Sequence, residues 1–149
     1  MPSPAVNEAT RREWRALGFF YDRDHGARAW TLRGSRDGLR RFAELLRAYA
    51  NDPLHAGLWE HEHYGPFWYL EVMTATEPRI DGHAIEGRLE DLVRLGEVVE
   101  AAVGRATPGE RVEVGRAYAP ASRWSLELVV EADNFDPASA DDEGRDGEL

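Results

Sequence analysis

Two amphipathic segments of helical period, each preceded by short runs of strand character, restrict this chain of 149 residues to folds that pack helices against a sheet. The first segment begins after Ser35, a favourable N-cap residue, and stops at residues 51–53. Its apolar face consists of Leu39, Phe42, Leu45, Leu46 and Tyr49. The second begins after Gly87 and ends at Gly104, which suits the left-handed position beyond a helix. Its apolar face consists of Leu89, Leu92, Val93, Val99 and Val103.

The strand-like runs come in pairs around these two helices. They are residues 14–21, 27–33, 67–74, 79–86, 112–114 and 124–130. The order ββαββαββ predicts a single α+β domain in which an antiparallel sheet of about six strands carries both helices on one face. The other face of the sheet is left for solvent or for a partner.

A shift of 53 residues lays one hairpin-plus-helix unit on the next. It places Leu32 over Ile85 and Gly34 over Gly87, and in the helices Leu39 over Leu92, Phe42 over Leu95 and Glu44 over Glu97. This spacing leaves an internal ββα duplication open, because any two units of this kind share similar spacing.

Composition changes along the chain and predicts its limits. Residues 1–11 are polar, contain two prolines and show no period, which predicts a flexible arm. Residues 12–133 form the predicted α+β domain. Residues 134–149 are acidic and poor in large apolar side chains, which predicts a disordered tail.

The residue types that are missing exclude several chemistries. The chain has no cysteine and no lysine, so thiolate metal sites, disulfides, Schiff bases and Walker-type phosphate binding are excluded. The net charge of −10 disfavours nucleic acid as a partner and favours a basic protein. With no signal-like or membrane-spanning stretch in the sequence, we expect a cytoplasmic protein that does not bind a membrane.

The densest polar cluster is Trp59-Glu-His-Glu-His-Tyr-Gly-Pro66. If it is extended, His61 and His63 share one side, and Glu60, Glu62 and Tyr64 share the other. Two imidazoles at this spacing could ligate a metal if a third donor such as His83 or Glu86 joined them. The simpler interpretation is that these side chains are exposed at the start of a strand, so we expect no metal and no cofactor.

Aromatic residues on the predicted strands offer a second candidate surface. Trp68 and Tyr69 are neighbours and must point to opposite faces of a sheet. An open sheet face with aromatic and arginine side chains would suit a protein partner. A core on both sides of the sheet, or a homodimer that covers the second face, explains the same pattern, so the oligomeric state is left open.

Catalytic motifs are missing from the sequence. There is no G-x-S-x-G nucleophile elbow, no glycine-rich phosphate loop and no dinucleotide fingerprint. An enzyme hypothesis would rest on the Glu60–Tyr64 cluster alone, and we expect a protein that is not an enzyme.

Several segments together resemble a known family. They are Trp30-Thr-Leu-Arg-Gly-Ser-Arg-Asp-Gly-Leu39, Glu60-His-Glu-His-Tyr-Gly-Pro66 with Tyr69-Leu-Glu-Val-Met-Thr74, Ile85-Glu-Gly87, Tyr118-Ala-Pro120 and Asn134-Phe-Asp136. In these the chain resembles the thirty-second class of polymorphic-toxin immunity proteins, over roughly residues 26–137. The resemblance implies an α+β protein that binds a toxin in the producing or sibling cell and blocks it. It brings no catalytic residues.

The leading hypothesis is therefore a non-enzymatic protein that neutralises a cognate bacterial toxin, which we expect to be basic. The candidate contact residues are Glu60, His61, Glu62, His63, Tyr64, Trp68 and Tyr69. One alternative is a metal-dependent enzyme or metal-binding protein that uses His61, His63 and His83. Another is a module that binds a small ligand in a cavity between sheet and helices.

Overall fold

The computed structural model describes residues 3–66 and 70–141. Its helices are α1 (Pro4–Leu17), α2 (Arg36–Asn51), α3 (Leu89–Arg105) and α4 (Gly115–Tyr118), with 3-10 turns η1 (Pro53–His55) and η2 (Pro137–Ala140). Its strands are β1 (Phe20–Asp24), β2 (Ala29–Gly34), β3 (His61–Tyr64), β4 (Leu70–Thr74), β5 (Arg79–Ile80), β6 (Ile85–Gly87), β7 (Arg111–Glu113) and β8 (Ser125–Val130). Within the described residues, no helix is long and apolar enough to cross a lipid bilayer.

The strands form two mixed sheets of four, in the orders β1-β2-β8-β7 and β3-β4-β6-β5. Each sheet joins two antiparallel hairpins through a central parallel pair, β2 with β8 and β4 with β6. The predicted α+β class is confirmed, but the prediction of one antiparallel sheet of about six strands is wrong. The hairpins of the first sheet, β1-β2 and β7-β8, are separated in sequence by both α2 and α3, whereas β3-β4 and β5-β6 of the second sheet follow one another with no helix between them.

Two differences in the strands explain the miscount. The run at residues 79–86 is broken by a turn, in which Asp81 accepts hydrogen bonds from the N–H groups of His83 and Ala84. The polar segment His61–Tyr64 is a strand in its own right. Its residues are titratable and not β-branched, so β-strand propensity did not predict a separate strand there.

The element order repeats as β1-β2-α2-β3-β4 and β5-β6-α3-β7-β8, and equivalent hydrogen bonds recur in both halves. The N–H of Trp59 bonds the carbonyl of Thr74 at 2.8 Å, and the N–H of Gly109 bonds the carbonyl of Val130 at 2.7 Å. The repeat extends beyond the ββα unit suggested by the sequence and comprises ββαββ.

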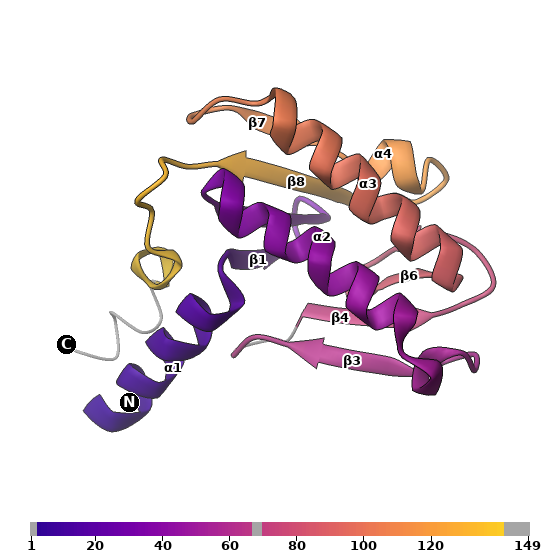
Figure 1. Cartoon of the computed structure of the whole chain (residues 1–149), viewed down its shortest axis with the longest axis horizontal. Coiled ribbons are helices and arrows are strands. Elements are labelled where there is room, and N and C mark those ends of the chain that lie inside the picture. Colours follow the sequence, from indigo (N-terminus) through magenta and orange to yellow (C-terminus); the bar gives the residue numbers. More distant parts are fainter. Residues whose placement is uncertain (1–2, 67–69, 142–149) are drawn as a thin grey trace.

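Helices α2 and α3 lie side by side, run in opposite directions and cover the same side of the molecule (Figure 1). They approach closely where a Cβ on Gly96 would lie 3.3 Å from the carbonyl oxygen of Ala43. Ala43 and Gly96 are related by the shift of 53 residues, so the helices meet at equivalent positions. The buried core includes Leu39, Phe42, Leu46, Leu92, Leu95 and Val99 from these helices. Gly104, predicted to follow this helix, lies inside α3, whose C-cap is Ala106.

Helix α1 occupies residues 4–11 of the segment predicted to be a flexible arm and the first half of the strand predicted for residues 14–21; residues 1–2 lie outside the described residues. Ser3 caps its N-terminus, Pro4 occupies the first turn, and Gly18 ends it with φ 96°. The residues it buries are Asn7, Thr10 and Trp14. Helix α1 was missed from the sequence because two of these three buried residues are polar, although Ser3, Pro4 and Gly18 are typical of helix ends.

The start of the acidic tail packs on α1. The indole N–H of Trp14 donates to the buried carboxylate of Asp141 at 2.9 Å, and Arg15 pairs with Asp136 at 3.1 Å. The prediction of a disordered tail is therefore wrong for residues 134–141, which include η2; residues 142–149 lie outside the described residues.

Candidate functional site

The predicted polar cluster lies on β3, the edge strand of the second sheet. β3 pairs antiparallel with β4, with His61 opposite Met73 and His63 opposite Glu71. As predicted for an extended segment, His61 and His63 share one side of the strand, and Glu62 and the half-buried Tyr64 share the other.

The two histidines meet a carboxylate from the neighbouring strand. The Oε1 atom of Glu71 lies 2.6 Å from Nε2 of His63 and 4.0 Å from Nε2 of His61. The third donors named from the sequence, His83 and Glu86, are not part of this group. Glu71 was missed because the sequence does not give the register between β3 and β4.

The inner side of β3 attaches to the rest of the molecule. Glu62 Oε1 lies 3.1 Å from Nε2 of His55, and the carbonyl of Tyr64 accepts a hydrogen bond from the Tyr21 hydroxyl at 3.0 Å. Burial, with a smaller effect of the nearby Glu62 charge, raises the pKa of Tyr64. Glu62 and Tyr64 are therefore partly occupied by contacts within the chain.

A buried polar network below β3 was missed from the sequence. The Tyr49 hydroxyl donates to the Glu60 carbonyl at 2.6 Å and lies 2.8 Å from the Thr74 hydroxyl. The Thr74 hydroxyl donates to the His55 carbonyl at 2.7 Å. The rings of Tyr49 and His55 stack with centroids 3.8 Å apart. The network joins α2, η1 and β4 to the residue before β3, and so fixes the segment between them.

His55 is buried beside acceptors. Burial lowers the pKa of its imidazole, but hydrogen bonds to the Tyr49 carbonyl and the Glu62 carboxylate, together with the charges of Asp52 and Glu62, outweigh burial and raise this pKa above 6.5. The geometry thus favours a protonated His55.

The segment held by this network carries a group of exposed apolar side chains. Leu54, Leu58 and Trp59 are 77%, 53% and 58% exposed, and we call these three residues the apolar corner. Among the described residues, Val6 is the only other large hydrophobic residue with comparable exposure. Acidic side chains lie close to the corner in sequence at Asp52, Glu60 and Glu62.

Trp59 has a left-handed backbone with φ 72°. At the equivalent position of the second half the chain has Gly109, with φ 99°. For a bulky residue this conformation is disfavoured by about 1–2 kcal/mol. Trp59 therefore occupies a position that backbone sterics would assign to glycine.

The other described aromatic residues do not form an exposed sheet surface. Trp14, Tyr21 and Trp30 are buried in the core, and Trp124 is half-buried with its ring 5.4 Å from that of His25. The expected aromatic face is therefore wrong for these residues. Trp68 and Tyr69 lie outside the described residues.

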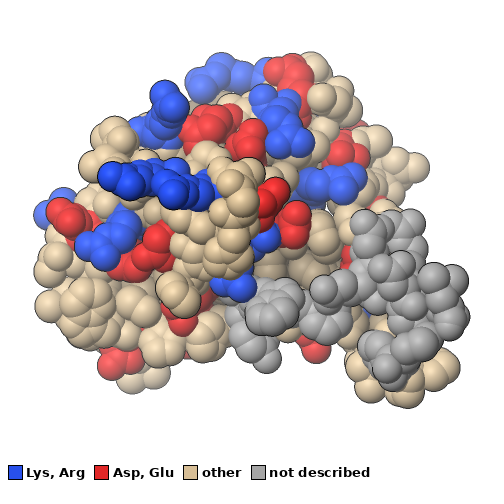
Figure 2. Space-filling view, turned by 180° about the vertical axis from the view of Figure 1, so that it is seen from behind, with Lys and Arg blue, Asp and Glu red and all other residues tan. Residues whose placement is uncertain are grey.

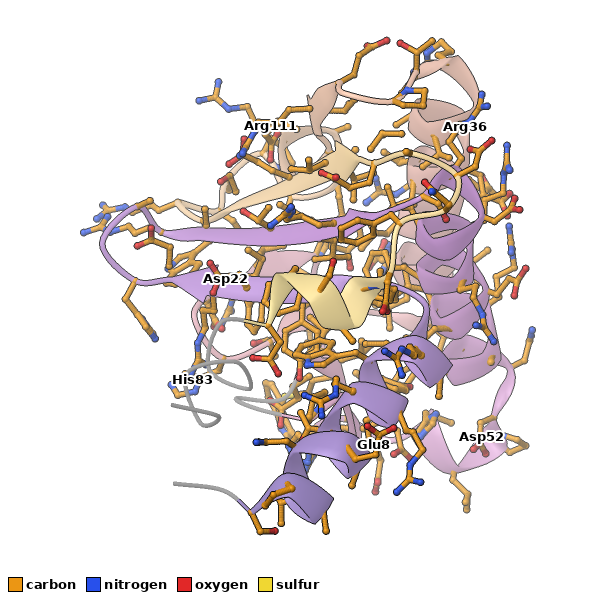
Figure 3. All side chains as sticks on the ribbon, turned by 90° about the vertical axis from the view of Figure 1, so that its left-hand side faces the viewer. Glu8, Asp22, Arg36, Asp52, His83 and Arg111 are labelled. Atoms are coloured by element: carbon orange, nitrogen blue, oxygen red, sulfur yellow. The ribbon has the colours of Figure 1, made fainter. Side chains whose placement is uncertain are left out.

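The side of the molecule away from α2 and α3 carries both signs of charge. Figure 2 shows arginine and acidic side chains interspersed over the described part of this side. A hollow of about 710 Å³ lies over the outer face of the first sheet, and its lining includes Phe20, Asp22, Thr31, Arg111 and Glu127. It is not the cavity between sheet and helices considered from the sequence. In Figure 3, Asp22 and His83 lie on the sheet side and Asp52 on the helix side.

One family model matches the chain. Residues 29–78, a third of the sequence, match the family Immunity protein 32. This confirms the resemblance noted from the sequence over a shorter segment than expected. Neither a curated protein nor a solved structure matches the chain. The matched segment extends from β2 to Pro78 and contains the apolar corner, the buried network and the histidine pair.

Proposed function

Because residues 29–78 carry the pattern of the Immunity protein 32 family, we propose that this chain is an immunity protein that binds a cognate bacterial toxin and neutralises it without catalysis. The contact surface is the apolar corner together with the polar residues Glu60–Tyr64 that follow it. The exposure of the corner is the observation that carries this proposal.

An exposed group of two leucines and a tryptophan has a free-energy cost in water that a bound partner would remove. Burying apolar surface gains about 25 cal/mol per Å², and tryptophan is among the residues that most often anchor a protein interface. The corner is also preorganised, because the buried network of Tyr49, His55 and Thr74 holds the backbone on both sides of it. A rigid anchor loses less conformational entropy on binding.

The second half of the molecule lacks this corner. Equivalent positions differ by 53 residues in the helices (Ser35 and Arg88 are the N-caps) but by 50 at Trp59 and Gly109. The first half therefore has three additional residues, and η1 is three residues long (Pro53–His55). The additional residues expose Leu54, and Trp59 stands where the second half has a glycine. Both differences point to a role other than folding.

Charge supports a basic toxin as the partner. The chain has a net charge of −10, and Asp52 and Glu62 keep side chains that are 39% and 50% exposed. Such a charge raises the rate of encounter with a basic partner, and this rate falls as salt increases. The apolar corner would then determine how slowly the complex dissociates.

Co-expression tests the proposal. The product of the neighbouring gene is induced in a sensitive bacterium with this chain or with an empty vector, and survival and copurification are measured. We expect the product to be lethal alone, harmless with this chain, and recovered with it as a complex. A product that is harmless alone, or one that still kills in the presence of this chain, would contradict the proposal.

A further inference from the structure

The outer side of the second sheet brings three ligand-type side chains to one point. His61 and His63 project from β3, and Glu71 projects from β4 opposite His63. One nitrogen of each imidazole and one carboxylate oxygen lie within 4.8 Å of one another. His61 and His63 belong to the proposed toxin-contact surface, but that proposal makes no use of their convergence with Glu71.

The tautomer of His61 prepares it for a metal ion. Its Nδ1 lies 3.1 Å from the backbone carbonyl of Trp59, and a carbonyl can only accept a hydrogen bond. Nδ1 is therefore the donor, and the neutral form of this imidazole has its lone pair on Nε2, the atom 4.0 Å from Oε1 of Glu71. Metal-binding histidines usually donate their other N–H in this way, often to a backbone carbonyl, which fixes the orientation of the ring.

The distances suit one ion after a small adjustment. With bonds of 2.0–2.2 Å, ligand atoms around a tetrahedral zinc ion are separated by about 3.3 Å. The observed separations from Glu71 Oε1 are 2.6 Å to His63 and 4.0 Å to His61, on either side of that value. Both imidazoles are about half exposed, so rotation of their rings can shift the nitrogen atoms by the fraction of an ångström that is required. An ion would displace the proton now shared by His63 and Glu71.

The second half of the molecule offers a comparison. Glu127 on β8 is the counterpart of Glu71, and Arg111 on β7 is the counterpart of His61. There the glutamate is satisfied by a guanidinium at 3.3 Å, which is always protonated and cannot bind a metal. An arginine is thus sufficient to pair with this carboxylate in this fold, whereas the first half has two histidines.

We propose that His61, His63 and Glu71 bind one divalent transition-metal ion of the zinc or nickel type. Two imidazoles and one carboxylate are a donor set that such ions accept, and Mg²⁺ or Ca²⁺ would require more oxygen ligands. The remaining coordination positions face away from the sheet and are open to water or to a further ligand.

Calorimetric titration tests the site on the chain alone. The protein is prepared without a histidine tag, treated with a chelator, and titrated with Zn²⁺, Ni²⁺ and Mg²⁺. We expect one Zn²⁺ or Ni²⁺ per chain and no binding of Mg²⁺.

Variants separate this site from adventitious binding. His61→Arg copies the second half of the molecule, should fold normally, and should weaken binding at least about tenfold; Glu71→Gln should also weaken it. His83→Gln, in the β5–β6 turn, is the matched control and should bind as the original chain does. Absence of Zn²⁺ and Ni²⁺ binding, or binding that survives His61→Arg in a chain with unchanged circular dichroism, would overturn the proposal. Because no toxin is present, this result is independent of the proposed function.

Discussion

Trp59 combines an unfavourable backbone with an exposed side chain. A residue retained for folding would be expected to relieve its φ of 72° or bury its ring, and Trp59 does neither fully. Strain of this kind tends to occur at functional positions. The observation supports a partner contact at this residue.

Glycine and alanine at this position separate strain from function. Trp59→Gly and Trp59→Ala lose the same ring, but only glycine accepts the left-handed backbone without penalty. We expect Trp59→Gly to keep a free energy of unfolding about 1 kcal/mol higher than Trp59→Ala in urea denaturation. Equal stabilities would show that the backbone at residue 59 is not strained.

His55 makes stability depend on pH. Because its pKa is raised in the folded state, the protonated imidazole contributes stability that is fully present below about pH 6.5 and is lost as pH rises through the folded-state pKa. We expect the free energy of unfolding to fall over this range in the original chain and to change less in His55→Gln. Glu62→Gln should reduce the slope in part, since the Glu62 hydrogen bond contributes to the shift. A slope unchanged in both variants would contradict this account.

The sequence predicted some site residues and not others for a simple reason. Alternation along one strand placed His61 and His63 on the same side. Glu71, Tyr49 and Thr74 join the site through pairing between strands and through a buried network, and neither is encoded in local spacing. Alignment of Trp59 with Gly109 could have identified Trp59 from the sequence. This alignment requires the offset between the two halves to change from 53 residues in the helices to 50 after them.

At the scale of elements, α2 and α3 were predicted because each has an apolar face, and α1 was missed because its buried face is mostly polar. The sheets were mispredicted because local spacing does not show which strands pair. β2 pairs in parallel with β8 from near the other end of the described chain, and β4 pairs in parallel with β6, beyond the intervening β5.

The helix crossing gives a test of that packing. Gly96→Leu must push α3 away from the Ala43 carbonyl, only 3.3 Å from the first added carbon, and we expect a loss of about 1–3 kcal/mol in the free energy of unfolding. A Cβ at Gly104 on the same helix would meet nothing within 4 Å, so Gly104→Leu is the matched control. It should be neutral or stabilising by up to about 1 kcal/mol. Similar losses in both variants would contradict the close crossing.

The buried network gives a test of how the apolar corner is positioned. Tyr49→Phe keeps the ring and removes the hydroxyl that donates to the Glu60 carbonyl. We expect a loss of about 0.5–1.5 kcal/mol in thermal or urea unfolding, because the Glu60 carbonyl loses the Tyr49 hydroxyl but keeps the N–H of Thr74 as a donor. Hydrogen exchange of the amides at residues 54–60 should accelerate in this variant, while exchange in β8 rises only with the global stability. Unchanged hydrogen exchange at residues 54–60 would contradict the account that the buried network positions the apolar corner.

The two halves of the molecule repeat one order of elements, β1-β2-α2-β3-β4 and β5-β6-α3-β7-β8, but have different residues at equivalent positions. The second half has Gly109 and an ion pair between Arg111 and Glu127. The first half has the apolar corner, which includes Trp59, and the histidine pair. The family match also covers mainly the first half, from residue 29 to 78. We infer that the second half completes the sheets and that the first half carries the function.

The affinity of the purified cognate toxin for the original chain and for Trp59→Gly tests the central claim most directly. The account predicts that Trp59→Gly keeps the fold and weakens binding by at least 2 kcal/mol, about 30-fold, whereas Val6→Ala, a change at the other exposed apolar residue, leaves the affinity unchanged. A toxin that binds Trp59→Gly as tightly as the original chain would contradict the assignment of the apolar corner as its contact surface.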